Sequence, residues 1–180
     1  GFRIVTSRER LCIVGGNRGV IYGVYEFLES LGCRFFTHNC EKIPTIPDLS
    51  VGEYDVRQVP CIEYREHNYA DAVQNPRFSV RCRFNGSHHR IPARMSGYMP
   101  YAWFVHTFEK MVPTVVYGES HPEYYSLVNG KRIVRSGGRT QLCLTNPDVY
   151  KICVAAVRKA LTEHPEARII SISQNDWHDH

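Results

Sequence analysis

The chain has 180 residues, 43% of them hydrophobic and 12% aromatic, which is enough for one folded core or two small ones. Its formal net charge is +4, with both signs mixed along the sequence and no basic run, so a nucleic-acid partner has no specific support. No apolar stretch approaches the roughly 20 residues that a membrane span needs, and no signal peptide opens the chain. Because the sequence begins in mid-pattern, we expect a piece of a longer protein.

The cysteines are odd in number and form no CxxC pair. Most of them have apolar neighbours in sequence, so we interpret them as buried free thiols and expect neither a disulfide framework nor a catalytic cysteine. They are Cys12, Cys33, Cys40, Cys61, Cys82, Cys143 and Cys153.

The first sixty residues predict a small module with the order strand, strand, helix, strand, strand. Short strands are expected at Arg3–Thr6 and Arg10–Val14, followed by a helix from Asn17 that Gly32 ends. Further strands are expected at Cys33–Phe36 and Val51–Gln58.

The glycines of GGNRG, residues 15–19, invite comparison with nucleotide-binding loops. The run lacks the dinucleotide fingerprint and also the lysine and hydroxyl residue of a phosphate loop. We therefore favour a role in packing and turn geometry.

A second pattern begins at Val59. Cys61–Tyr64 reads as a short strand whose end carries Arg65 and His67, and Pro76–Arg83 reads as a short helix. The aromatic-rich stretch 85–113 is long for a loop, and such loops are usually functional or disordered. Its aromatic side chains either present flat faces to sugar rings or pack the loop onto the protein, and the sequence leaves both open.

The C-terminal third carries the clearest local signals. Residues 121–132 predict a hairpin around an Asn-Gly turn. A helix follows with Asn146 as N-cap and Pro147 in the first position, and its apolar residues recur on one face. The run ARIISISQND, residues 167–176, then reads as a buried parallel strand whose C-terminal end collects polar and aromatic groups. Ligands bind at that end of the strands in α/β barrels and open α/β sheets.

Five motifs carry a resemblance to known families. GGNRGVIYGVYEFLESLGCRFF (15–36) resembles the small domain that precedes the catalytic barrel in hexosaminidases and α-glucuronidases. HTFEKMVP (106–113), HPEYYSLVNGKR (121–132), LCLTNPDV (142–149) and SISQND (171–176) together resemble a bacterial family first catalogued as a domain of unknown function, DUF4838. Part of that family is classed as glycoside hydrolase family 163, endo-β-N-acetylglucosaminidases acting on complex N-glycans.

The resemblance implies an α/β fold in two parts. Residues 1–58 would form part of a small α+β accessory domain, and residues 59–180 would form the first part of a (β/α)₈ TIM-like barrel. The implied reaction is retaining hydrolysis of an N-glycan, assisted by the substrate's own 2-acetamido group. No cofactor is implied, and the partner would be a carbohydrate or the glycan of a glycoprotein outside the cytoplasm.

That mechanism needs a carboxylate to orient the acetamido group and an acid to protonate the leaving oxygen. Asp176 is the candidate carboxylate, with sugar-binding and structural turn roles as alternatives. The acid lies beyond His180, or is Glu123 or Glu119. Candidate substrate-binding residues are Asn175, His106, Arg65, His67, His121 and Trp177, although His106 and His121 also suit a hydrogen-bonded structural role.

Three further hypotheses concern metal binding and function. His178, Asp179 and His180 are metal-ligand residue types, but three successive residues cannot all face one ion from regular structure, so no metal is expected. An α-glucuronidase-like enzyme would need a basic subsite, for which Arg65 or Arg94 is available. A non-catalytic carbohydrate-binding module would need no pair of carboxylates in one pocket.

Overall fold

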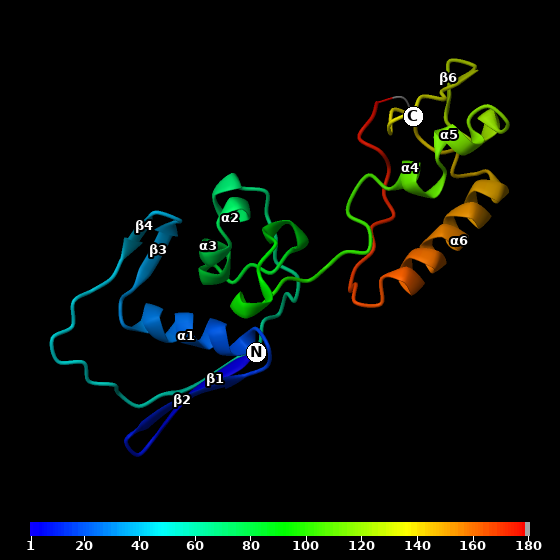
Figure 1. Cartoon of the computed structure of the whole chain (residues 1–180). Coiled ribbons are helices and arrows are strands. Elements are labelled where there is room, and N and C mark those ends of the chain that lie inside the picture. The colour runs from blue at the N-terminus through cyan, green and yellow to red at the C-terminus, as the bar shows by residue number, and fades with distance from the viewer. Residues whose placement is uncertain (179–180) are drawn as a thin grey trace. The chain divides into compact units, whose positions relative to one another are not determined.

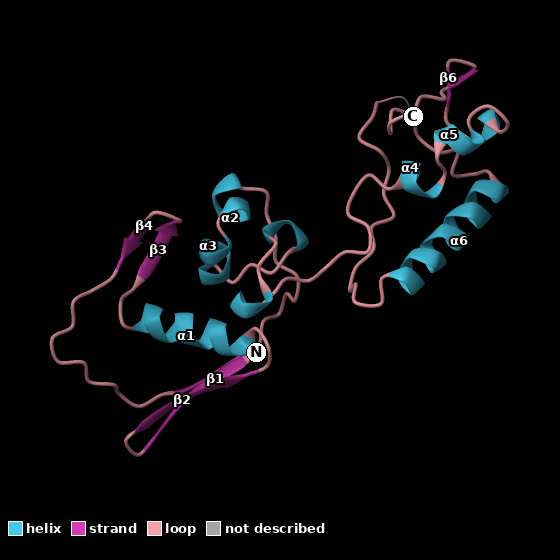
Figure 2. Ribbon diagram, viewed as in Figure 1, coloured by secondary structure: helices cyan, strands magenta, loops and turns pink. Residues whose placement is uncertain are grey.

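The computed structural model describes residues 1–178 as a mixed α+β protein with three small sheets and six α-helices (Figures 1 and 2). The chain forms two compact units, Gly1–Met99 and Pro100–His180. No barrel is closed within the described residues, and both the barrel and its expected start at residue 59 stay predictions.

An antiparallel sheet opens the first unit. Strand β1 (Phe2–Ser7) lies between β2 (Arg10–Gly15) and β5 (Asp55–Gln58). Ile4 is opposite Ile13 in β2 and Val56 in β5. The two predicted N-terminal strands are confirmed, whereas the strand expected from Val51 begins only at Asp55.

Helix α1 (Gly19–Ser30) packs onto this sheet, and Phe2, Ile4 and Tyr22 form the buried centre of the contact. A Cβ atom on Gly23 would lie 2.6 Å from the Ile13 side chain, so glycine permits the close approach of helix and sheet. Gly32 follows the helix with φ of +93°, a conformation that favours glycine. The expected helix and its stop signal are both confirmed.

The remainder of the first unit consists of short elements. Strands β3 (Arg34–Thr37) and β4 (Cys40–Lys42) form a hairpin, of which only the first strand was predicted. The helices that follow are α2 (Ala70–Gln74), α3 (Pro76–Arg81) and two 3₁₀ helices, η1 (Ser87–His89) and η2 (Ala93–Met95). The short helix expected from Pro76 is confirmed.

The strand predicted at Cys61–Tyr64 is absent from the structure. The Asn85 side chain binds this segment instead, donating from Nδ2 to the Glu63 carbonyl at 2.8 Å and accepting from the Arg65 amide at 2.8 Å. One amide side chain thus replaces the donor and acceptor that a neighbouring strand would offer. The backbone bends at Cys61 and at Glu63, and a strand also needs a backbone partner, so the apolar pattern alone did not imply a strand.

The second unit is built around one apolar core. It contains α4 (Phe108–Met111), α5 (Thr114–Tyr117), the 3₁₀ helix η3 (Pro122–Tyr124), the hairpin strands β6 (Leu127–Val128) and β7 (Lys131–Arg132), and α6 (Pro147–Glu163). Its buried residues are Phe108, Met111, Val112, Tyr124, Tyr125, Leu142 and Val149. Phe108 belongs to this core, and Trp103 packs against it. These two aromatic residues of the stretch 85–113 therefore serve packing.

The hairpin and α6 are confirmed in their expected places. Asn129 and Gly130 both have positive φ, as the turn requires. The Asn146 side chain caps α6 by accepting from the amides of Asp148 and Val149. The first part of the hairpin was wrongly predicted as strand, because residues 122–124 close a 3₁₀ turn around Pro122.

The run 167–176 lies beside the segment 100–107. The Ala102 amide donates to the Ile169 carbonyl at 2.9 Å and the Ser171 amide to the Trp103 carbonyl at 3.0 Å, in parallel orientation. This run was predicted as a buried strand, but it forms one isolated bridge, and Ile172 is 58% exposed. Within the described residues it pairs with 100–107 alone, so part of its apolar surface stays uncovered.

Candidate functional site

The polar end of the run 167–176 and the residues around His106 form one site, called here the polar tip (residues 106–109 and 173–177). The Thr107 amide donates to the Ser173 carbonyl at 3.0 Å, and the Ser173 amide donates to Thr107 Oγ1 at the same distance. The His106 amide donates to Ser173 Oγ at 2.9 Å. These bonds place His106 next to Gln174, 68 residues later in the chain.

His106 is held in a strained conformation with its imidazole exposed. Its φ is +60°, which is uncommon for residues other than glycine and often marks a functional position. Nδ1 lies 3.1 Å from the Gln174 carbonyl oxygen. Because a carbonyl only accepts, Nδ1 carries the proton, and Nε2 of the neutral ring is left as an acceptor.

Asn175 is buried at 3% exposure. Its Nδ2 donates to the Thr140 carbonyl at 2.7 Å, and its Oδ1 accepts from the Glu109 amide at 3.4 Å. Its backbone exchanges two hydrogen bonds with the Gln141 amide side chain. The side chain predicted to bind sugar hydroxyls therefore holds the polar tip together.

Asp176 is exposed between two tethered residues. Asn175 is fixed as described, and the Trp177 carbonyl accepts from Gln141 Nε2 at 3.0 Å. Trp177 itself is half-buried. The backbone on both sides of Asp176 is thus anchored, whereas the residue itself is exposed.

Glu109 is a member of the polar tip that the sequence did not single out. Its Oε1 accepts from the amide and the hydroxyl of Thr114, whereas Oε2 is buried without a hydrogen-bond partner among residues 1–178. Burial raises the pKa of Tyr125 to about 12, and the nearby Glu109 carboxylate adds to this effect. The sequence signal that could have identified Glu109 is its position in the motif HTFEKMVP (106–113).

His121 belongs to a different cluster. Its Nδ1 lies 3.0 Å from Glu123 Oε1, and its ring stacks on Tyr124 at 4.6 Å between centroids. The pKa of Glu123 is lowered, first by its own backbone amide and then by His121. A lowered pKa keeps this carboxylate ionised, which is unfavourable for the general-acid role considered for it.

Arg65 and His67 lie in the first unit. Arg65 donates from Nε to the Arg83 carbonyl at 2.8 Å and from one terminal nitrogen to the Ile62 carbonyl at 2.6 Å. His67 accepts from the Tyr69 amide at 2.9 Å. Both residues thus have structural contacts, and their sharing of a pocket with Asp176 stays a prediction.

The buried His89 lies against His67 and was not predicted. Its side chain is fully buried, and the centre of its ring lies 5.3 Å from the centre of the His67 ring. Ser79 Oγ donates to the Ala72 carbonyl and so accepts from His89 Nδ1. His89 Nε2 then has no hydrogen-bond partner among the described residues. Burial lowers the pKa of His89, which keeps the ring neutral.

The cysteine prediction is partly confirmed. All seven thiols are free. Burial was wrongly expected for Cys12, Cys40 and Cys61, which are exposed. Cys12 and Cys40 lie in the short strands β2 and β4, and Cys61 lies in the loop after β5, so neighbouring apolar residues did not imply burial.

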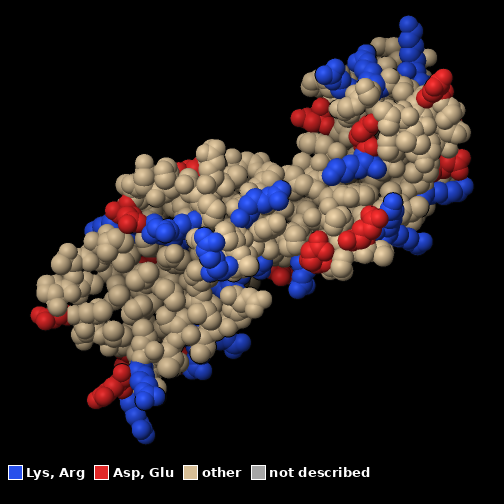
Figure 3. All heavy atoms as spheres, viewed as in Figure 1, with Lys and Arg blue, Asp and Glu red and all other residues tan. Residues whose placement is uncertain are grey.

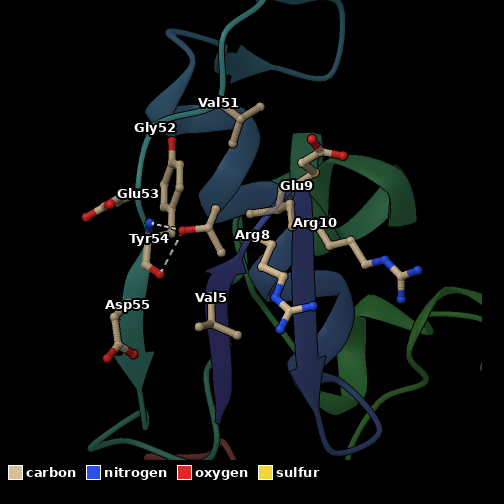
Figure 4. A pocket seen from close by; sticks show the side chains of 11 residues that line it. Val5, Arg8, Glu9, Arg10, Val51, Gly52, Glu53, Tyr54 and Asp55 are labelled. Carbon is tan, nitrogen blue, oxygen red and sulfur yellow. Dashed lines mark hydrogen bonds between the residues drawn. The ribbon is translucent and has the colours of Figure 1, made fainter.

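Other features of the surface carry no comparable chemistry. An open surface pocket of about 960 Å³ is lined by the β1–β2 hairpin and by residues 51–55, with Arg8 and Arg10 on one side and Glu53 and Asp55 on the other (Figure 4). Acidic and basic side chains are also interspersed over the face drawn in Figure 3. Within residues 1–178 no group of three potential metal ligands converges; the predicted trio continues at Asp179 and His180, outside the described residues.

The fold and the polar tip define the chain as a mixed α+β protein that presents an exposed carboxylate and an imidazole from paired extended segments. Residues 35–180 match the family described as Domain of unknown function (DUF4838), and the chain belongs to this family. Four of the five quoted motifs lie in that range. No curated protein and no solved structure matches the chain. Among the described residues no helix is long and apolar enough to cross a membrane.

Proposed function

We propose that the protein is a glycoside hydrolase, a retaining endo-β-N-acetylglucosaminidase that acts on N-glycans outside the cytoplasm. The observation that carries the proposal is the polar tip, where the Asp176 carboxylate is exposed and the His106 ring is fixed by Gln174. The tip follows paired parallel segments, the position at which α/β barrels bind their ligands. The resemblance of the motifs to family 163 hydrolases supplies the reaction class.

In this proposal Asp176 acts on the substrate's 2-acetamido group. The carboxylate accepts the acetamido N–H and polarises it, so that the acetamido carbonyl oxygen attacks the anomeric carbon as the glycosidic bond breaks. Water then opens the cyclic intermediate and restores the configuration. His106 Nε2 accepts a hydrogen bond from a sugar hydroxyl. Asn175 does not contact the sugar but fixes the backbone next to Asp176.

The acid that protonates the leaving oxygen is not assigned to Glu123, because its carboxylate is held ionised. Glu119, which is exposed, remains a candidate for this acid. The barrel that the family resemblance implies would provide further carboxylates at the same ends of neighbouring strands.

The test is glycan release from a complex-type N-glycoprotein, followed by mass spectrometry. The protein is compared with Asp176→Asn and with Asp48→Asn, a control at another exposed aspartate. Cleavage between the two core N-acetylglucosamines, lost only in Asp176→Asn, supports the proposal. Release of a uronic acid from a glucuronoxylan instead would indicate the α-glucuronidase-like activity, and no release of any sugar by the folded protein would favour a binding module.

A further inference from the structure

A second polar cavity lies entirely within the first unit. It has a volume of about 430 Å³, within the range of small-molecule sites. The start of α1 forms one side through Gly16, Arg18 and Tyr22, and Glu63, Arg65 and Asn85 form part of the other. The turn before the helix is tight, because the Gly16 carbonyl accepts from the Gly19 amide at 2.7 Å.

The cavity collects hydrogen-bond donors and positive charge. Helix α1 has no acidic residue in its first turn and no side-chain cap, so the positive end of its dipole is uncompensated there. Arg18 and Arg65 outnumber Glu63 among the lining residues. The two terminal nitrogens of Arg65 carry four N–H groups, and the bond to the Ile62 carbonyl uses one of them.

Tyr22 provides an independent indication of a ligand. The residue is 5% exposed, lines the cavity, and its phenol oxygen is buried without a hydrogen-bond partner among residues 1–178. The Arg65 guanidinium lies 5.5 Å from the centre of its ring. Burial raises the pKa of Tyr22, while the charges of Arg65 and Arg18 and an interaction of the Arg65 side chain with the phenol act in the opposite direction, so the phenol stays protonated.

We infer that this cavity binds an oxyanion, in the form of a carboxylate, sulfate or phosphate group. Guanidinium groups and backbone amides only donate, and the orphaned phenol has a proton to donate as well. Arg18 and Arg65 are half-buried, and one N–H of Arg18 already donates to the Gly97 carbonyl at 3.4 Å. An oxyanion accepts from the remaining N–H groups and balances their charge, which a neutral ligand does not. The inference does not depend on the proposed hydrolase activity, since none of its residues belongs to the polar tip.

Isothermal titration calorimetry of the full chain tests the inference with sodium sulfate, inorganic phosphate and glucuronate, and with glucose as the neutral control. We expect binding of at least one anion and none of glucose. Preference for sulfate and phosphate would indicate a free inorganic ion, and preference for glucuronate an acidic sugar. Heat equal to that of glucose for all three anions would overturn the inference.

Matched variants locate the site. Tyr22→Phe keeps the ring in the core and removes only the hydroxyl, and it should weaken binding by about tenfold or more, the effect of losing a hydrogen bond to a charged group. Tyr25→Phe is the control on the same helix, because the Tyr25 ring packs against Phe35. Equal affinity in both variants would contradict the assignment.

Arg18→Gln should weaken binding similarly, whereas Arg10→Gln in the exposed hairpin should not. Gly1 also lines the cavity, so the N-terminally acetylated chain is titrated in parallel. Unchanged affinity supports the side-chain site. Loss of binding on acetylation would assign the anion to the terminal ammonium group and overturn the inference.

Discussion

Replacing Asn175 by alanine tests whether this side chain supports the site or binds substrate. The substitution leaves the Thr140 carbonyl and the Glu109 amide without their partner inside the protein. A buried polar group deprived of its partner costs about 1–3 kcal/mol. The bond to Thr140 is short at 2.7 Å and that to Glu109 long at 3.4 Å, so we expect a total loss of about 2 kcal/mol in the free energy of unfolding.

Urea unfolding followed by tryptophan fluorescence measures this loss selectively. The chain has two tryptophans, Trp103 and Trp177, and both lie in the unit 100–180. With a slope of about 1 kcal/mol per molar urea, the midpoint should fall by about 2 M. The exposed neighbour provides the control, because Asp176→Asn should change the unfolding free energy by less than about 0.5 kcal/mol. A loss below about 0.5 kcal/mol for Asn175→Ala would refute the buried network and return Asn175 to the surface of the binding site.

Three further predictions concern the fold. Gly23→Ala should destabilise the first unit by about 1–3 kcal/mol, because the new methyl group would meet Ile13. Gly16→Ala is the control, since its methyl group would meet nothing within 4 Å and should be tolerated. Circular dichroism during urea unfolding compares the two variants. Asn146→Ala should cost about 1 kcal/mol through loss of the α6 cap, and an unchanged fluorescence midpoint would contradict the cap. The pKa of His89 is lowered by burial, so the stability that its neutral form provides is present above the ordinary pKa of about 6.5 and is lost as the pH falls below it. His89→Phe should reduce the loss of stability between about pH 7.5 and pH 5.5, and an unaltered pH dependence would show that another group is responsible.

The elements predicted correctly are those whose signals lie within a few residues. Asn146 and Pro147 mark the start of α6, Gly32 marks the end of α1, and Asn129 with Gly130 marks a turn. In each case the conformation is decided by a side chain or a glycine at the position itself. The family was recognised for a related reason, because its motifs are short and contiguous.

The contacts that decide the site were beyond sequence reasoning because they join distant residues. Asn175 is buried by Gln141, 34 residues earlier, and nothing in SISQND distinguishes an amide that faces a sugar from one that faces Gln141. Arg65 is held by carbonyl groups at residues 62 and 83, which no local pattern indicates. The strand expected at Cys61–Tyr64 failed for the same reason, since pairing depends on a neighbour.

The side-chain amide of Asn85 makes the first unit sensitive to chemical damage. Asn85 precedes Gly86, and asparagine followed by glycine is the dipeptide most prone to spontaneous deamidation. Deamidation would turn the Nδ2 donor into a second acceptor, placing a negative charge against the Glu63 carbonyl that it now binds. In the folded protein Asn85 is 3% exposed and the Gly86 amide, the attacking nitrogen, donates to the Arg65 carbonyl, so we expect the change in unfolded chains. Such chains could not restore the bonds to residues 63–65 on refolding, and a mass increase at this peptide would mark them.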